Sequence, residues 1–92
     1  MNYSPLFKPP LTRKLKSGRV RLSPGEDVGE HTTEKREEVI VVLKGRATLD
    51  IEGRSIVLKE GDAHYIEEGK IHNILNKTNR EVEYIYVVGL FN

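Results

Sequence analysis

Short apolar runs separated by glycine-containing turns are the feature that most constrains the fold of this 92-residue chain. The turns recur at intervals of roughly eight residues, the spacing of strands in an all-β domain. They contain Gly25, Gly45, Gly53, Gly61 and Gly69. No stretch carries the apolar stripe of an amphipathic helix. The chain is therefore predicted to be all-β, either a sandwich or a barrel.

Alternation within the runs indicates which strands have a face in water. Residues 47–52 alternate apolar with polar side chains, as a strand with one solvated face does. Residues 39–43 and 82–88 are apolar on both faces, which predicts central strands. Tyr84 and Tyr86 share one face of the last run, so we expect them to be buried, lining a cavity or a contact between subunits.

The length of the chain limits the number of domains. A chain this short encloses one core, so we predict a single barrel domain over residues 20–92. Residues 1–19 are predicted to be an extended basic N-terminal arm or a first strand, since three prolines near the start disfavour a helix. Without cysteine there is no disulfide, so a homodimer or a bound metal is expected to add stability.

Charge and hydropathy bear on partners and location. The net charge is only +1, but residues 1–25 have no acidic side chain. Because this segment lacks interleaved aromatics suited to stacking on bases, we expect a solvated or subunit-bridging arm and no nucleic-acid partner. No apolar run has the length of a signal peptide or a membrane span, which predicts a soluble cytoplasmic protein. Abundant Lys, Glu and Arg without Trp or Cys resembles thermophile composition.

Two of the histidines and one glutamate have surroundings that indicate a site. His31 and Thr33 are two residues apart and would project from one face of a strand. Glu38 begins the apolar run 39–43 and would share a face with its core side chains. A carboxylate in that position loses much of its hydration, and a nearby cation would offset the cost.

The spacing of these residues resembles the two motifs of the cupin family. The first motif is matched by Gly25, His31, Thr33, Glu38 and Gly45, with Thr33 where the family has a second histidine. The second is matched by Gly61, Glu67, Gly69, His72 and Asn76, with Glu67 where the family has proline. The resemblance covers residues 25–76.

The resemblance implies a cupin-type double-stranded β-helix, a jelly-roll-like barrel that is usually dimeric. It also implies a divalent metal ion, iron, manganese, nickel or zinc, held inside by His31, Glu38 and His72. Thr33 stands at the fourth ligand position, and its neutral hydroxyl is a poorer ligand than imidazole. We therefore expect a weaker site with an open coordination position. The alternative is a barrel that has lost its metal and keeps His31 and His72 as core groups.

Catalytic residues are not assigned by the sequence, and His64 and Tyr65 are only weak candidates. They follow a turn and point to opposite faces, so one of them at most reaches the cavity. His64 would serve as a replacement ligand or general base, Tyr65 as a proton donor. The alternative interpretation is a surface histidine and a core tyrosine. The charged run 34–38 is expected to be a solvated loop except for Glu38.

The sequence is compatible with three functions. The first is a metal-dependent cupin acting on a small molecule, either an isomerase of a sugar or keto compound or an oxygenase. The second is a non-catalytic barrel with weak or no metal, whose mouth binds a small anionic ligand near the basic arm or senses it for a partner protein. The third is a dimeric structural barrel with an empty cavity. Whether the protein is an enzyme stays open.

Overall fold

The computed structural model describes residues 1–91, and within them it has strands but no helix. The strands are β1 (Asn2–Phe7), β2 (Leu15–Leu22), β3 (His31–Thr32), β4 (Arg36–Lys44), β5 (Ala47–Ile51), β6 (Arg54–Leu58), β7 (Ala63–Ile66), β8 (Ile71–Leu75) and β9 (Val82–Leu90). The all-β prediction is confirmed. Within the same range, no helix is long and apolar enough to cross a membrane.

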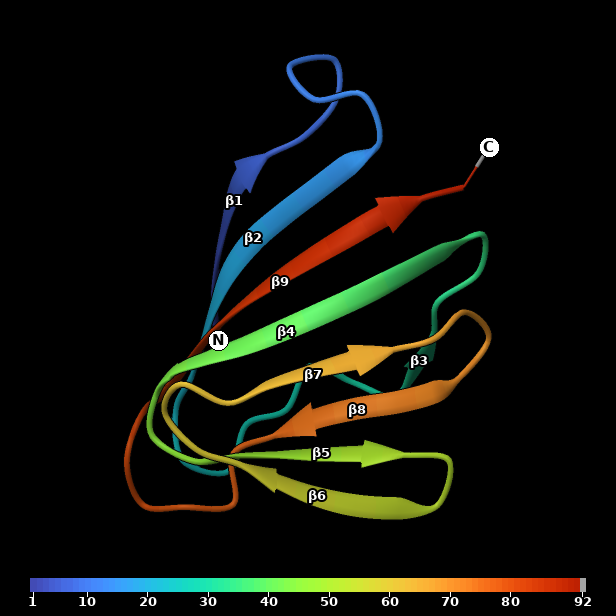
Figure 1. The fold of residues 1–92 in the computed structure, drawn as a ribbon. Helices are drawn as coiled ribbons and strands as arrows, with labels where there is room; N and C mark the ends of the chain where they lie inside the picture. The colour runs from blue at the N-terminus through green and yellow to red at the C-terminus, as the bar shows by residue number, and fades with distance from the viewer. Residues whose placement is uncertain (92) are drawn as a thin grey trace.

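Two antiparallel sheets face each other (Figure 1). The five-stranded sheet has the order β1-β2-β9-β4-β7, and the four-stranded sheet has the order β3-β8-β5-β6. In Figure 1 the long strands β2, β9 and β4 cross the upper half, and β8, β5 and β6 lie below them. The double-sheet architecture expected from the motifs is present, although the sheets do not close strictly into one cylinder.

The core lies between the inner faces of the two sheets. On β4, the side chains of Glu38, Ile40 and Val42 are buried, as the strand periodicity predicted. On the outer face of β4, Val39 is 37% exposed and Leu43 is 41% exposed. The prediction that residues 39–43 form a central strand is confirmed, since β4 lies between β9 and β7.

The N-terminal segment is part of the five-stranded sheet. β1 forms the edge strand and pairs with β2, and β2 pairs along its whole length with β9. The boundary predicted between residues 19 and 20 falls inside β2, and the division into arm and barrel stays a prediction. Arg19 and Arg21 form ion pairs of 3.2 and 3.7 Å with Glu83 of β9, so part of the basic charge is neutralised on the sheet.

Two motif residues are explained by the fold alone. Gly45 has φ 77°, and a Cβ there would lie 2.6 Å from the carbonyl oxygen of Glu81, so only glycine fits this turn. The Asn76 side chain is buried and donates to the carbonyls of Leu22 at 3.0 Å and Arg80 at 2.7 Å. The bonds of Asn76 connect the loop after β8 to β2. Gly45 and Asn76 therefore have structural roles.

Candidate metal centre

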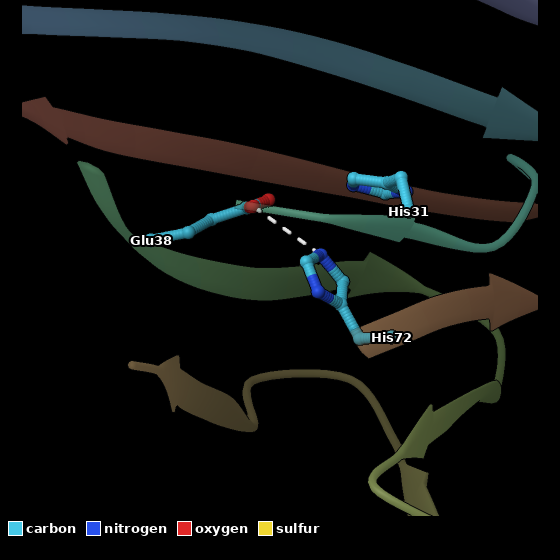
Figure 2. A group of neighbouring side chains, drawn as sticks. All are labelled: His31, Glu38 and His72. Atoms are coloured by element: carbon cyan, nitrogen blue, oxygen red, sulfur yellow. Dashed lines mark ion pairs between the residues drawn. The ribbon is translucent and has the colours of Figure 1, made fainter. Parts of the chain in front are cut away.

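Three side chains from three strands converge between the sheets (Figure 2). His31 comes from β3, Glu38 from β4 and His72 from β8, and one ligand atom of each lies within 4.8 Å of the others. His31 pairs directly with His72 across the four-stranded sheet, with ring centroids 4.2 Å apart. Glu38 approaches from the opposite sheet, so the group links the two layers of the fold.

Backbone carbonyls orient both imidazole rings. Nδ1 of His72 donates to the carbonyl of Lys70 at 3.0 Å, and Nδ1 of His31 donates to the carbonyl of Gly29 at 2.9 Å. A carbonyl oxygen only accepts, so each Nδ1 must carry the hydrogen. In the neutral rings, each Nε2 then keeps a lone pair, the arrangement typical of metal-bound histidine.

The surroundings of the Nε2 atom of His72 show whether His31, Glu38 and His72 fit a metal ion. This atom is buried, it has no hydrogen-bond partner among the described residues, and it lies 3.6 Å from Oε1 of Glu38. A lone pair facing a carboxylate oxygen is unfavourable unless a cation or a proton lies between them. Two imidazoles and one carboxylate are a donor set that divalent transition metals accept, so the residues fit the expected ion.

A proton competes for the same position. Burial would lower the pKa of His72, but the Glu38 carboxylate and the hydrogen bond to the carbonyl of Lys70 outweigh it, and the pKa is raised overall. Without a metal, protonated His72 therefore forms an ion pair with Glu38 more readily than an ordinary histidine would.

Thr33 lies beside this group but offers no ligand of comparable strength. Its side chain is 4% exposed, and its Oγ1 has no hydrogen-bond partner among the described residues. The amide of Gly69 donates to the carbonyl of Thr33 at 2.8 Å, which fixes the backbone here. Together with His31 and Glu38, Thr33 is among the residues that line a cavity of about 390 Å³.

The rest of the cavity is lined by aromatic and basic side chains. Of the two alternatives for Tyr84 and Tyr86, a cavity or a contact between subunits, the structure shows the first, since both line this cavity. Burial, followed by the charge of Glu38, raises the pKa of Tyr84. Burial, followed by the contact with Tyr3, raises the pKa of Tyr86. Both phenols therefore stay protonated near neutral pH and can donate hydrogen bonds.

Sequence reasoning missed two cations that line this cavity, Lys16 and Arg36. The charged run 34–38 was expected to be a loop, but β4 already begins at Arg36. That expectation holds for Glu34 and Lys35, which are exposed and precede β4, and it was wrong for Arg36 and Glu37.

Arg36 continues the inward alternation of Glu38. The side chains of Glu38, Ile40 and Val42 recur inward every second residue. Counting back two residues from Glu38 would have predicted that Arg36 also points inward.

His64 and Tyr65 are not part of the metal group, the cluster formed by His31, Glu38 and His72. Tyr65 is 53% exposed on the outer face of β7, and its hydroxyl donates to Oε1 of Glu37 at 2.9 Å. His64 pairs with Ile40, whose side chain is buried, so the side chain of His64 is on the inner face. His64 does not, however, line the cavity. The alternative interpretation of a surface histidine and a core tyrosine was wrong, because the register of β7 on β4 places Tyr65 outside.

Comparison with known proteins identifies the family. The family model for the cupin domain matches residues 18–88. A curated relative, the oxalate-binding protein of Thermotoga maritima, is 31% identical over 70 residues, which cover 76% of this chain and 58% of the relative. The chain therefore spans little more than half the length of that relative.

Solved structures agree with this assignment. The crystal structure of a predicted oxalate decarboxylase from Thermotoga maritima superposes with a TM-score of 0.79 at 30% identity, covering 83% of this chain and 66% of that one. The cupin domain of an XRE family transcriptional regulator from Enterobacter cloacae superposes with a TM-score of 0.88 at 24% identity, covering 99% and 97%. The second likeness concerns the fold alone. The predicted cupin-type fold is confirmed, and the chain belongs to the cupin family.

Proposed function

We propose that this protein is a small metal-binding cupin that binds a small molecule in the cavity beside its metal. His31, Glu38 and His72 hold a divalent ion, iron, manganese, nickel or zinc. The observation that carries the proposal is the buried Nε2 of His72, which faces the Glu38 carboxylate without a hydrogen-bond partner among the described residues. A divalent cation satisfies both acceptors at once.

The cavity supplies groups that can orient a bound molecule. When bound, the metal acts as a Lewis acid that polarises an oxygen of the ligand. The hydroxyl of Thr33 and the protonated phenols of Tyr84 and Tyr86 offer hydrogen bonds around it. This environment suits reactions of carbonyl and hydroxy compounds, such as the isomerisation of a sugar or keto compound or an oxygenation.

A second candidate, a non-catalytic binding or sensory barrel, is favoured by the name of the relative that is 31% identical, an oxalate-binding protein. The position of His64 agrees with it, since this histidine does not line the cavity and is not placed to act as a general base. The two candidates differ in turnover. A ligand that raises the melting temperature of the metal-loaded protein and is recovered unchanged supports the binder.

The metal site is tested by elemental analysis of protein purified without added metal and without an immobilised-metal column. We expect near-stoichiometric divalent metal in the wild type. Groups that merely support a metal ligand contribute about 10- to 100-fold in affinity, so loss of a ligand in His72→Ala should cost more than about 100-fold. His64→Ala is the matched control, because His64 lies on the inner face outside the metal group.

Wild-type protein that is free of metal and also refuses added iron, manganese, nickel and zinc would exclude the site. A melting temperature that chelation leaves unchanged, together with equal metal content in His72→Ala and His64→Ala, would exclude these ligands.

A further inference from the structure

Two cations line the cavity beside the metal group, Lys16 on β2 and Arg36 on β4. Both are half-buried, and neither forms a salt bridge with a carboxylate of residues 1–91. Nε of Arg36 donates to the carbonyl of Glu34 at 3.4 Å. The terminal guanidinium nitrogens and the Lys16 ammonium are left to interact with a ligand or water.

Strand register places these cations on the inner face with the metal ligand Glu38. Lys16 pairs with Val88, and Val88 pairs with Glu38, so the three stand in one row across the sheet. Neighbouring strands are separated by about 4.8 Å, so the backbones of Lys16 and Glu38 lie about 10 Å apart. Arg36 precedes Glu38 by two residues and projects from the same face. A small molecule can reach from the metal position to both cations.

The charge of the lining favours an anion. Glu38 is the only carboxylate residue among those that line the cavity, and a divalent ion would more than neutralise it. Lys16 and Arg36 then add uncompensated positive charge in a partly enclosed space. A negatively charged ligand would offset the cost of burying them, and a neutral ligand would not.

Thr33 supplies an independent observation that points to a ligand. Its Oγ1 is buried and has no hydrogen-bond partner among the described residues, and Thr33 is one of the residues that line the cavity. A buried hydroxyl without a partner is costly, so an oxygen of a bound molecule or a water is expected within its reach. Tyr3 and Tyr86 also line the cavity and stack with an interplanar angle of 15°, forming a flat aromatic surface.

We propose that the cavity binds a small organic anion, with an oxygen at the metal beside Thr33 and a carboxylate or phosphate group held by Lys16 and Arg36. The contact between the ligand oxygen and the metal rests on the function proposed above. The contact between the anionic group and the side chains of Lys16 and Arg36 rests on the lining of the cavity alone.

The test measures the affinity of metal-loaded protein for malonate, succinate, inorganic phosphate and the neutral malonamide by calorimetry. The variant Lys16→Gln/Arg36→Gln should bind the preferred anion at least about tenfold more weakly than the wild type, because it loses two charge-assisted contacts. Arg13→Gln/Lys14→Gln removes the same charge from exposed positions outside the cavity and should bind like the wild type. Malonamide should bind weakly to all three proteins.

Equal affinity of the two double variants would overturn the proposal, as would tight binding of malonamide or no binding of any anion to the wild type. If Lys16→Gln/Arg36→Gln melts early, Lys16→Gln alone and the charge-preserving Lys16→Arg take its place, and only Lys16→Gln should lose affinity. Whether malonate, succinate or phosphate binds best distinguishes carboxylate from phosphate ligands.

Elemental analysis of the same samples separates this proposal from the metal site. The variant Lys16→Gln/Arg36→Gln should retain its metal. If the wild type holds no metal, the proposed function fails. Anion binding that still depends on Lys16 and Arg36 would then support the contact between the anionic group and these two side chains. If metal is bound and the cations make no difference, only the present inference fails.

Discussion

The ring of Tyr86 lies against Gly18 of β2, and Tyr3 of β1 stacks with it at a centroid distance of 5.8 Å. A Cβ at position 18 would lie 2.5 Å from the Tyr86 hydroxyl oxygen and 2.7 Å from Cζ. The glycine is therefore required by the approach of the ring. This contact positions the aromatic wall of the cavity.

Gly18→Ala is expected to destabilise the protein by about 1–3 kcal/mol, the range for an overpacked site, because the Tyr86 ring must move. Urea denaturation measures the change. Gly89→Ala is the matched control in β9, since a Cβ there would lie 3.4 Å from Cγ of Glu37, a flexible side chain that can yield. Equal stability of the two variants would show that the ring is not held by Gly18.

The motif spacing predicted the metal group well because strand periodicity decides which side chains share a face. His31, Glu38 and His72 come together as that spacing implied. Lys16 and Arg36 were missed because basic residues in a charged segment are usually solvated, and their burial depends on the pairing of β2, β9 and β4. Pairing between distant strands is not encoded in local pattern.

At the level of elements, the turn between β7 and β8 organises the site. Its Gly69 amide donates to the carbonyl of Thr33 at 2.8 Å, and the Glu68 carboxylate accepts from the amide of Lys35 at 2.8 Å. Next in the chain, the carbonyl of Lys70 orients the His72 ring. One short turn thus fixes both the segment leading into β4 and the histidine of β8.

The contact between Glu38 of β4 and His72 of β8 predicts opposite pH dependences for two forms of the protein. In the metal-free form the folded pKa of His72 is raised, so its pairing with Glu38 stabilises the fold below the unfolded pKa. That contribution is lost as pH rises through the folded pKa. In the metal-loaded form His72 must be neutral, so stability should increase with pH over the same range.

Thermal melting across the mildly acidic to neutral range, with chelator or with added zinc, measures both trends. His72→Gln cannot titrate and binds metal poorly, so both of its curves should lose this dependence. A metal-free wild type that gains stability as pH rises through this range would contradict the pairing of His72 with Glu38.

At the scale of the whole molecule, no second layer formed by residues 1–91 covers the outer face of the five-stranded sheet. The outer face of the five-stranded sheet carries two neighbouring rows of mostly apolar side chains across β7, β4 and β9. These rows contain Tyr65, Val39 and Val87, and Ala63, Val41 and Ile85. The sequence predicted that residues 39–43 and 82–88 are apolar on both faces, and these rows carry that character onto the outer face.

The homodimer predicted from the sequence would cover this face with a second copy of the chain. Val39→Lys should shift the protein to monomer in analytical ultracentrifugation, because burying a lysine in an apolar contact costs more than the valine contact contributes. Val57→Lys is the control, since Val57 is 60% exposed on β6 of the other sheet. A wild type that is monomeric at all concentrations would contradict the dimer. If Val57→Lys dissociates the dimer and Val39→Lys does not, the subunits meet through the four-stranded sheet instead.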